Sequence, residues 1–172
     1  MQLQNKENTM KHKTAYLGIF TAVALICSYI ETLFPIPLGI PGVKLGLPNI
    51  VTVWILYLIG TREALLVSIL RILLSGFLFG NLFSIFYSLA GGLLSLIVMV
   101  LLKKTNLFRI IIVSIAGGIT HNVGQWLLAS VLVETYEILY YLPILVLAGT
   151  LTGFVIGMLS QEFVIRLKPW IH

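Results

Sequence analysis

Residues 82–104 read LFSIFYSLAGGLLSLIVMVLLKK, an apolar run that carries no charge until it ends in Lys103-Lys104. A helix needs about 20 largely apolar residues to cross the hydrocarbon core of a bilayer. This stretch therefore predicts a transmembrane helix. The rest of the chain agrees, because 59% of its residues are hydrophobic, only 10% are charged and the mean hydropathy is +1.04. Such values are typical of a membrane protein.

Five further apolar segments flank this run, and residues that break helices or carry charge separate them. We predict six spans, at about 14–34, 47–60, 62–80, 82–102, 107–133 and 141–165. They use almost the whole length of 172 residues. We therefore expect an all-α membrane protein with one six-helix transmembrane domain over residues 14–168. Short tails, 1–13 and 169–172, would lie outside it.

The positions of the cations predict the orientation of this bundle. With the N-terminus inside, nine of the eleven lysines and arginines fall at the inner ends of the spans, and only Lys44 and Arg71 do not. Cytoplasmic ends normally hold the excess of Lys and Arg. We expect a multi-pass protein of the plasma membrane with both termini cytoplasmic. The net charge of +5 then reflects anchors beside anionic lipids and not nucleic-acid binding.

Small residues recur at helical spacing in two of the predicted spans. Gly149, Gly153 and Gly157 share one face of the last span, and Gly18 and Ala22 share a face of the first. Such stripes let two helix backbones approach closely. The partner helix is either another span of the same bundle or a separate membrane subunit, and the sequence leaves both possibilities open.

Polar side chains inside a bilayer are expensive and therefore indicate function. From a rise of 1.5 Å per residue, Arg71 lies about 13 Å above Arg62 and His121 about 18 Å above Arg109. His121 and Gln125 share a helix face, being four residues apart. We predict that these groups converge on an outward-facing pocket, with Lys44 on the segment above it. The candidate substrate-binding residues are Glu31, Lys44, Asn49, Arg71, Asn81, His121, Asn122 and Gln125.

Two interpretations of this polar set remain open. In one, Arg71 and Glu31 form an internal ion pair and the other polar groups bond within the bundle. In the other, Arg71 binds an anionic or polar group of a solute, because a guanidinium suits bidentate contact with carboxylate or phosphate.

The sequence lacks the residues that several kinds of enzyme chemistry require. All six acidic residues are Glu, so the Asp-rich motif that holds magnesium and diphosphate in isoprenyl synthases is absent. The chain has no Gly-rich phosphate loop ending in Lys-Ser or Lys-Thr, so it does not use ATP by that route. The candidate histidine has no second histidine or cysteine near it in sequence. We expect no enzyme activity, no metal and no cofactor.

Four runs resemble a known family: KLGLPNIVT (44–52), LRILLSG (70–76), FGNLFS (79–84) and AGGITHNVGQ (116–125). They are similar to the Gx transporter family, whose members are also called heptaprenyl diphosphate synthase component I. The resemblance extends from about residue 13 to 165.

That family is in turn similar to the substrate-binding S components of energy-coupling factor (ECF) transporters. The resemblance implies six helices, both termini inside and a pocket that opens outward beneath the loop between the first two helices, here 35–46. It also implies a small-xxx-small motif on the first helix that docks on a membrane coupling subunit driven by ATPases. Gly18 and Ala22 match this motif approximately.

The leading hypothesis is therefore an S component that imports a small, vitamin-like or anionic solute, with a coupling subunit and ATPase subunits as partners. The alternative is a non-catalytic membrane accessory subunit of heptaprenyl diphosphate synthase, in menaquinone and isoprenoid metabolism. A stand-alone secondary transporter, with Glu31 and His121 relaying protons, is a third hypothesis.

Overall fold

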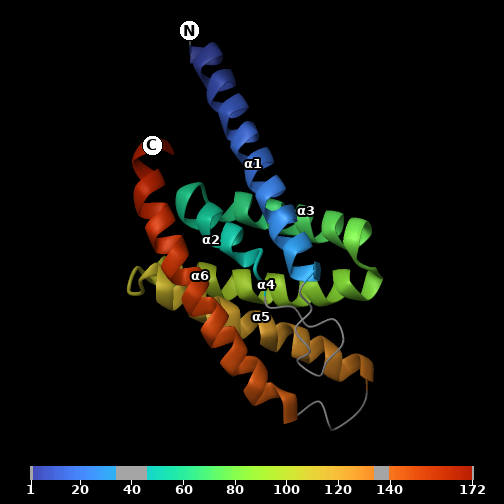
Figure 1. The fold of residues 1–172 in the computed structure, drawn as a ribbon. Coiled ribbons are helices and arrows are strands. Elements are labelled where there is room, and N and C mark those ends of the chain that lie inside the picture. Colours follow the sequence, from blue (N-terminus) through green and yellow to red (C-terminus); the bar gives the residue numbers. More distant parts are fainter. Residues whose placement is uncertain (1, 34–45, 134–139, 172) are drawn as a thin grey trace.

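The computed structural model describes residues 2–33, 46–133 and 140–171, and within these ranges every regular element is a helix. The polar segment before residue 13 continues the first helix, since Lys, Gln and Glu favour helix. Figure 1 shows how the helices pack. They are α1 (Gln2–Leu33), α2 (Asn49–Leu58), α3 (Thr61–Phe79), α4 (Leu82–Thr105), α5 (Ile110–Val133) and α6 (Leu142–Ile171).

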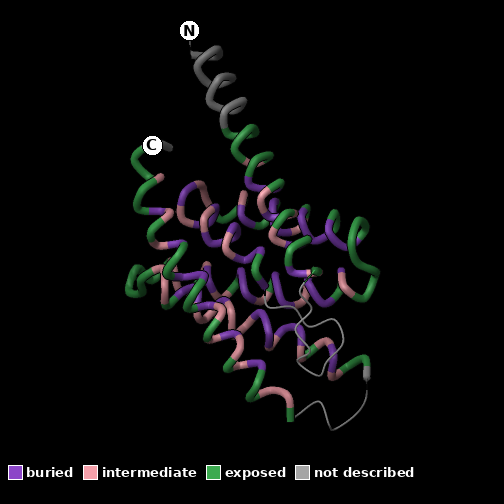
Figure 2. Tube along the Cα trace, viewed as in Figure 1, coloured by how far each residue is buried: buried purple, intermediate pink, exposed green. Residues whose placement is uncertain are grey.

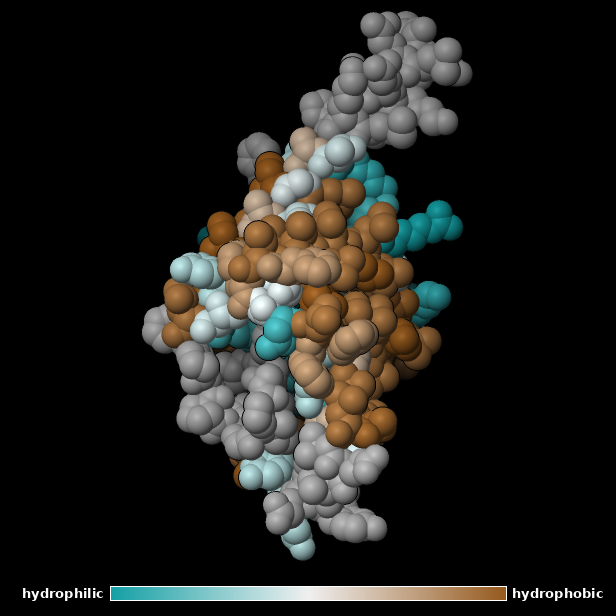
Figure 3. Space-filling view, turned by 90° about the vertical axis from the view of Figure 1, so that its right-hand side faces the viewer, coloured by the Kyte–Doolittle hydropathy of each residue, from teal (hydrophilic) through white to brown (hydrophobic). Residues whose placement is uncertain are grey.

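The predicted helical class and its membrane character are confirmed. Four segments in the described part are long and apolar enough to cross a membrane: Lys13–Leu33, Leu82–Thr105, Ile110–Leu132 and Leu142–Pro169. Figure 3 shows that brown, apolar side chains cover most of the middle of one face of the molecule. A surface of this kind suits lipid and not water.

The helix ends differ from the predicted spans at several places. α1 begins at Gln2, well before residue 14, and α6 runs past residue 165 to Ile171 with Pro169 inside it. α2 has 10 residues, about 15 Å of helix, which is half of the hydrocarbon core. α2 therefore does not cross a bilayer alone, and six crossings, like the domain boundaries, stay predictions.

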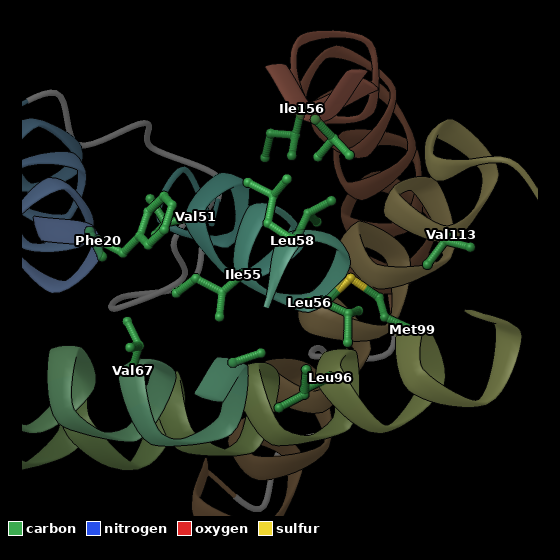
Figure 4. Packing of buried hydrophobic residues seen from close by; sticks show 14 residues of the cluster. Phe20, Val51, Ile55, Leu56, Leu58, Val67, Leu96, Met99, Val113 and Ile156 are labelled. Atoms are coloured by element: carbon green, nitrogen blue, oxygen red, sulfur yellow. The ribbon is translucent and has the colours of Figure 1, made fainter. Parts of the chain in front are cut away.

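α2 lies at the centre of the packing, although it is the shortest helix. Its residues Val51, Ile55 and Leu56 are fully buried. In Figure 4 they meet side chains from every other helix, among them Phe20 of α1 and Met99 of α4. Figure 2 shows the same centre as a run of purple, buried positions. A helix that is apolar all round is expected in such a place.

The glycine stripe of α6 packs inside the bundle, against α5. A Cβ atom at Gly149 would stand 2.6 Å from the carbonyl oxygen of Gly118, and one at Gly153 would stand 2.7 Å from that of Ser114. The Ser114 hydroxyl donates to the Gly153 carbonyl over 2.8 Å. Contacts this short leave no room for a side chain unless α5 and α6 move apart. Of the two partners that the sequence left open for this stripe, the structure shows the internal one.

In Figure 1 the two ends of the described chain lie toward the top, and the α2–α3 and α4–α5 connections lie toward the left. Cations link the helices near these connections. Lys13 of α1 pairs with Glu63 of α3 at 2.5 Å. Lys103 of α4 donates to the Leu56 carbonyl, one of the last carbonyls of α2, which have no partner within the helix.

Candidate functional site

Arg71 of α3 is a buried guanidinium in the interior of the bundle, with 4% of its surface exposed. Its Nη2 donates to Oδ1 of Asn49, the first residue of α2, over 3.4 Å. Its Nε has no hydrogen-bond acceptor among the described residues. A buried charge is stable only when contacts with other groups compensate for its loss of hydration. An Nε–H donor without an acceptor is therefore unusual. It leaves Arg71 with hydrogen-bonding capacity for a further group.

Glu31, near the end of α1, binds backbone just before α2. Its Oε1 accepts from the N–H of Gly46 over 2.5 Å and from that of Leu47 over 3.3 Å. The side chain is nearly buried, and its charge acts on Arg71 through space. Glu31 and Arg71 thus approach the beginning of α2 from α1 and from α3.

His121 and Gln125 of α5 face the same point from another side. Both are buried, and Nε2 of Gln125 lies 3.2 Å from Nε2 of His121, which confirms that they share a face. Cβ atoms added at Gly46 and at Gly91 would stand 3.3 Å and 3.0 Å from the imidazole ring. The ring is therefore held between the start of α2 and the middle of α4.

The two glycines beside His121 were not among the predicted site residues. At Gly91 a Cβ would also stand 2.7 Å from the His121 carbonyl oxygen, so only glycine lets α4 and α5 come this close. Gly46 has φ +81, a left-handed conformation that favours glycine. The Gly91-Gly92 pair was visible in the sequence, but nothing there indicated which helix it faces.

Two predicted residues lie apart from this cluster, and a third is not described by the structure. Asn122 points to α6, where its Nδ2 donates to the Leu145 carbonyl over 2.8 Å. Asn81 is exposed and caps α4, accepting from the Ser84 N–H over 2.8 Å. Lys44 and most of the predicted loop 35–46 lie outside the described residues. Binding roles for these three stay predictions.

The cluster therefore joins Glu31, Asn49, Arg71, His121 and Gln125 from four helices around the start of α2. One guanidinium, two amides and an imidazole suit the recognition of an anionic or polar group. Among the described residues no three His, Cys, Asp or Glu side chains gather as a metal site would require.

An apolar groove of about 740 Å³ lies between α1 and α3, and Gly18 and Ala22 line it. Both residues are exposed, and a Cβ added at Gly18 would meet nothing within 4 Å. Their small size is therefore not required by packing within the described bundle. The rest of the lining is Thr14, Leu17, Thr21, Leu25, Leu66, Val67, Ile69, Leu70 and Leu73.

A family model described as heptaprenyl diphosphate synthase component I matches residues 20–163, most of the chain. The chain belongs to this family. The match spans all the residues of the polar cluster and Ala22, and it begins just after Gly18. No curated protein and no solved structure matches the chain. The resemblance to the Gx transporter family, another name for this heptaprenyl diphosphate synthase component I family, is thus confirmed, whereas no finding bears on the likeness to ECF S components.

Proposed function

We propose that this chain is a non-catalytic membrane component of a heptaprenyl diphosphate synthase, and that it holds an anionic group of a small molecule at Arg71. The buried guanidinium carries the binding part of the proposal, since Nε keeps an unused donor at the start of α2. Membership of the component I family supports the partner, a prenyl diphosphate synthase subunit. Asn49, His121 and Gln125 complete the site, with Lys44 on the segment above it.

The proposed topology has six crossings, both termini in the cytoplasm and a single domain over residues 14–168 in the plasma membrane. α2 by itself would make an incomplete second crossing, because its 10 residues reach only about half way through the hydrocarbon core. Support comes from cations at helix ends that would share one end of the bundle: Lys13, where the first apolar segment begins, paired with Glu63 in the first turn of α3, and Lys103 in the last turn of α4. The positive-inside tendency places this end in the cytoplasm.

One observation favours a second candidate, the substrate-binding component of an ECF-type importer. The glycines of α6 are in contact with α5, but Gly18 and Ala22 face an open groove beside α3. A bilayer gives apolar helices no hydrophobic reason to associate, so small residues at a helix face favour close packing with a neighbouring helix. In this candidate a membrane coupling subunit packs there, and ATPase subunits drive the import of the solute held at Arg71.

Purification of the full chain from its native membrane distinguishes the two candidates. The eluate is analysed by mass spectrometry for proteins and for small molecules, with Arg71→Gln and Gly18→Leu as paired variants. A prenyl diphosphate synthase subunit, with an anionic metabolite that Arg71→Gln loses, is the expected result. A coupling subunit and ATPases that Gly18→Leu loses would support the importer instead. A metabolite retained by Arg71→Gln would contradict the proposed site.

A further inference from the structure

The start of α2 is a buried position where two positive features meet. The N–H groups of Gly46 and Leu47 lie in the turn that leads into α2, near the positive end of the helix dipole, and both are directed at Oε1 of Glu31. Arg71 reaches the same point through its bond to Asn49. Backbone N–H groups and a guanidinium together are the usual elements of an anion site in proteins.

A carboxylate of the protein already occupies this position. Glu31 accepts both N–H groups, at 2.5 Å and 3.3 Å, and its charge acts on Arg71. Glycine suits position 46, because its φ of +81 is left-handed and a Cβ there would stand 2.9 Å from the Asn49 amide nitrogen. The backbone is therefore shaped to bring these donors to a carboxylate.

Among the described residues, the site has more hydrogen-bond donors than the two N–H groups that Glu31 accepts from. Arg71 Nε, within a side chain that is almost completely buried, has no acceptor there. A guanidinium in a low-dielectric interior is best matched by an anion that takes two of its donors at once. Glu31 satisfies the backbone N–H groups, and a bound anion would satisfy these and the guanidinium together.

We infer that Glu31 occupies the anion position of the binding site, and that a ligand bearing a carboxylate or phosphate group must displace it from the Gly46 and Leu47 N–H groups. The inference rests on the proposed function of Arg71. Two anionic groups held close together in a buried site repel each other strongly, so the ligand and Glu31 compete. Glu31 thereby lowers the affinity and stabilises the empty site.

The competing interpretations of Glu31 predict opposite effects of removing its charge. If Glu31 were a ligand of the solute or only a support of the site, Glu31→Gln would weaken binding or leave it unchanged. If Glu31 is a competitor, Glu31→Gln strengthens the binding of an anion. Glutamine keeps the length and one oxygen for the backbone N–H groups, so the substitution changes mainly the charge.

The test uses the full chain in detergent micelles with inorganic phosphate as the probe. The unfolding temperature, followed by tryptophan fluorescence, is titrated against phosphate for the wild type, Glu31→Gln and Arg71→Gln. Glu162→Gln is the matched control, since Glu162 lies in an exposed pair with Arg166 on α6. We expect the half-saturating phosphate concentration of Glu31→Gln to fall by about tenfold or more, that of Glu162→Gln to stay unchanged and Arg71→Gln to show no response.

Equal or weaker phosphate binding by Glu31→Gln, in a protein whose wild type responds through Arg71, would overturn the inference and leave the proposed anion site standing. A lack of response in both the wild type and Glu31→Gln would overturn both. If Glu31→Gln does not fold, Glu31→Asp replaces it in the phosphate titration. Aspartate keeps the charge but is shorter by one methylene group. The half-saturating concentration of this variant is expected to lie below that of the wild type, and a value at or above the wild type overturns the inference.

Discussion

Nη2 of Arg71 lies 3.4 Å from Oδ1 of Asn49, so a buried guanidinium of α3 is joined to the first residue of the shortest helix. This contact connects a buried charge to the beginning of α2, where Glu31 and His121 also converge. The other buried polar side chains of the described residues are uncharged Ser, Thr, Asn and Gln. Among the described residues, the only cluster of ionisable side chains in the interior therefore surrounds the beginning of α2.

Replacement of Arg71 by Gln is expected to remove binding of the anionic metabolite. Loss of one partner of a buried, hydrogen-bonded charge pair costs about 2–5 kcal/mol, which corresponds to roughly 30-fold or more in affinity. The measurement is the amount of metabolite that remains on the protein purified from its native membrane. Arg166→Gln, at an exposed position on α6, is the matched control and should retain the metabolite. Equal retention by the two variants would contradict the assignment of Arg71.

An added methyl group at Gly153 is expected to destabilise the bundle. A Cβ there would stand 2.7 Å from the Ser114 carbonyl oxygen and 2.8 Å from Cα of Ile115, so α5 and α6 would have to separate. Overpacking of this kind costs about 1–3 kcal/mol. Thermal unfolding in detergent should therefore show a lower midpoint for Gly153→Ala. The control is Gly18→Ala, where the new Cβ meets nothing within 4 Å and alanine favours helix by up to about 1 kcal/mol. Similar midpoints for both variants would refute the packing argument.

Lys103 is expected to stabilise the end of α2, whereas its neighbour Lys104 is not. The Lys103 ammonium donates to the Leu56 carbonyl and lies 5.0 Å from the centroid of the Tyr57 ring. Lys104 is exposed. Lys103→Met should lower the free energy of unfolding by about 1–2 kcal/mol, and Lys104→Met should leave it nearly unchanged. Chemical denaturation in mixed micelles measures both, and a Lys104 effect as large as that of Lys103 would count against a specific contact.

The sequence predicts the helical class and the set of polar residues near Arg71. It does not predict which neighbouring helix each of these side chains contacts. His121 and Gln125 share a face because four residues make about one turn, and the structure brings them together. Asn122, one residue on, is rotated by about 100° and contacts α6 instead. Simple periodicity separates these two neighbours once the position of α6 is known. The sequence alone does not provide that position.

Other features depend on contacts between segments far apart in the chain. No local sequence pattern predicts that α2 is short. None predicts that Glu31 bonds to residues fifteen and sixteen positions later in the chain. The glycines illustrate the same limit. Gly153 and Gly18 both belong to small-residue stripes, yet one lies against α5 and the other lines an open groove. Which stripe remains available to a partner is a property of the packed bundle.

A large side chain at Gly18 is expected to disturb association with a membrane partner and not the fold. Leucine at this position would extend into the groove between α1 and α3, where the described bundle leaves space. Gly18→Leu should therefore unfold at the wild-type temperature and retain the metabolite held at Arg71, while a partner that packs on this groove is lost from the purified complex. Quantitative mass spectrometry of the complex measures this loss. Leu159→Ala, a change at an exposed position on α6, is the control and should leave the partners in place. A complex of unchanged composition in Gly18→Leu would show that the groove is not a docking surface, and would remove the observation that favours the importer.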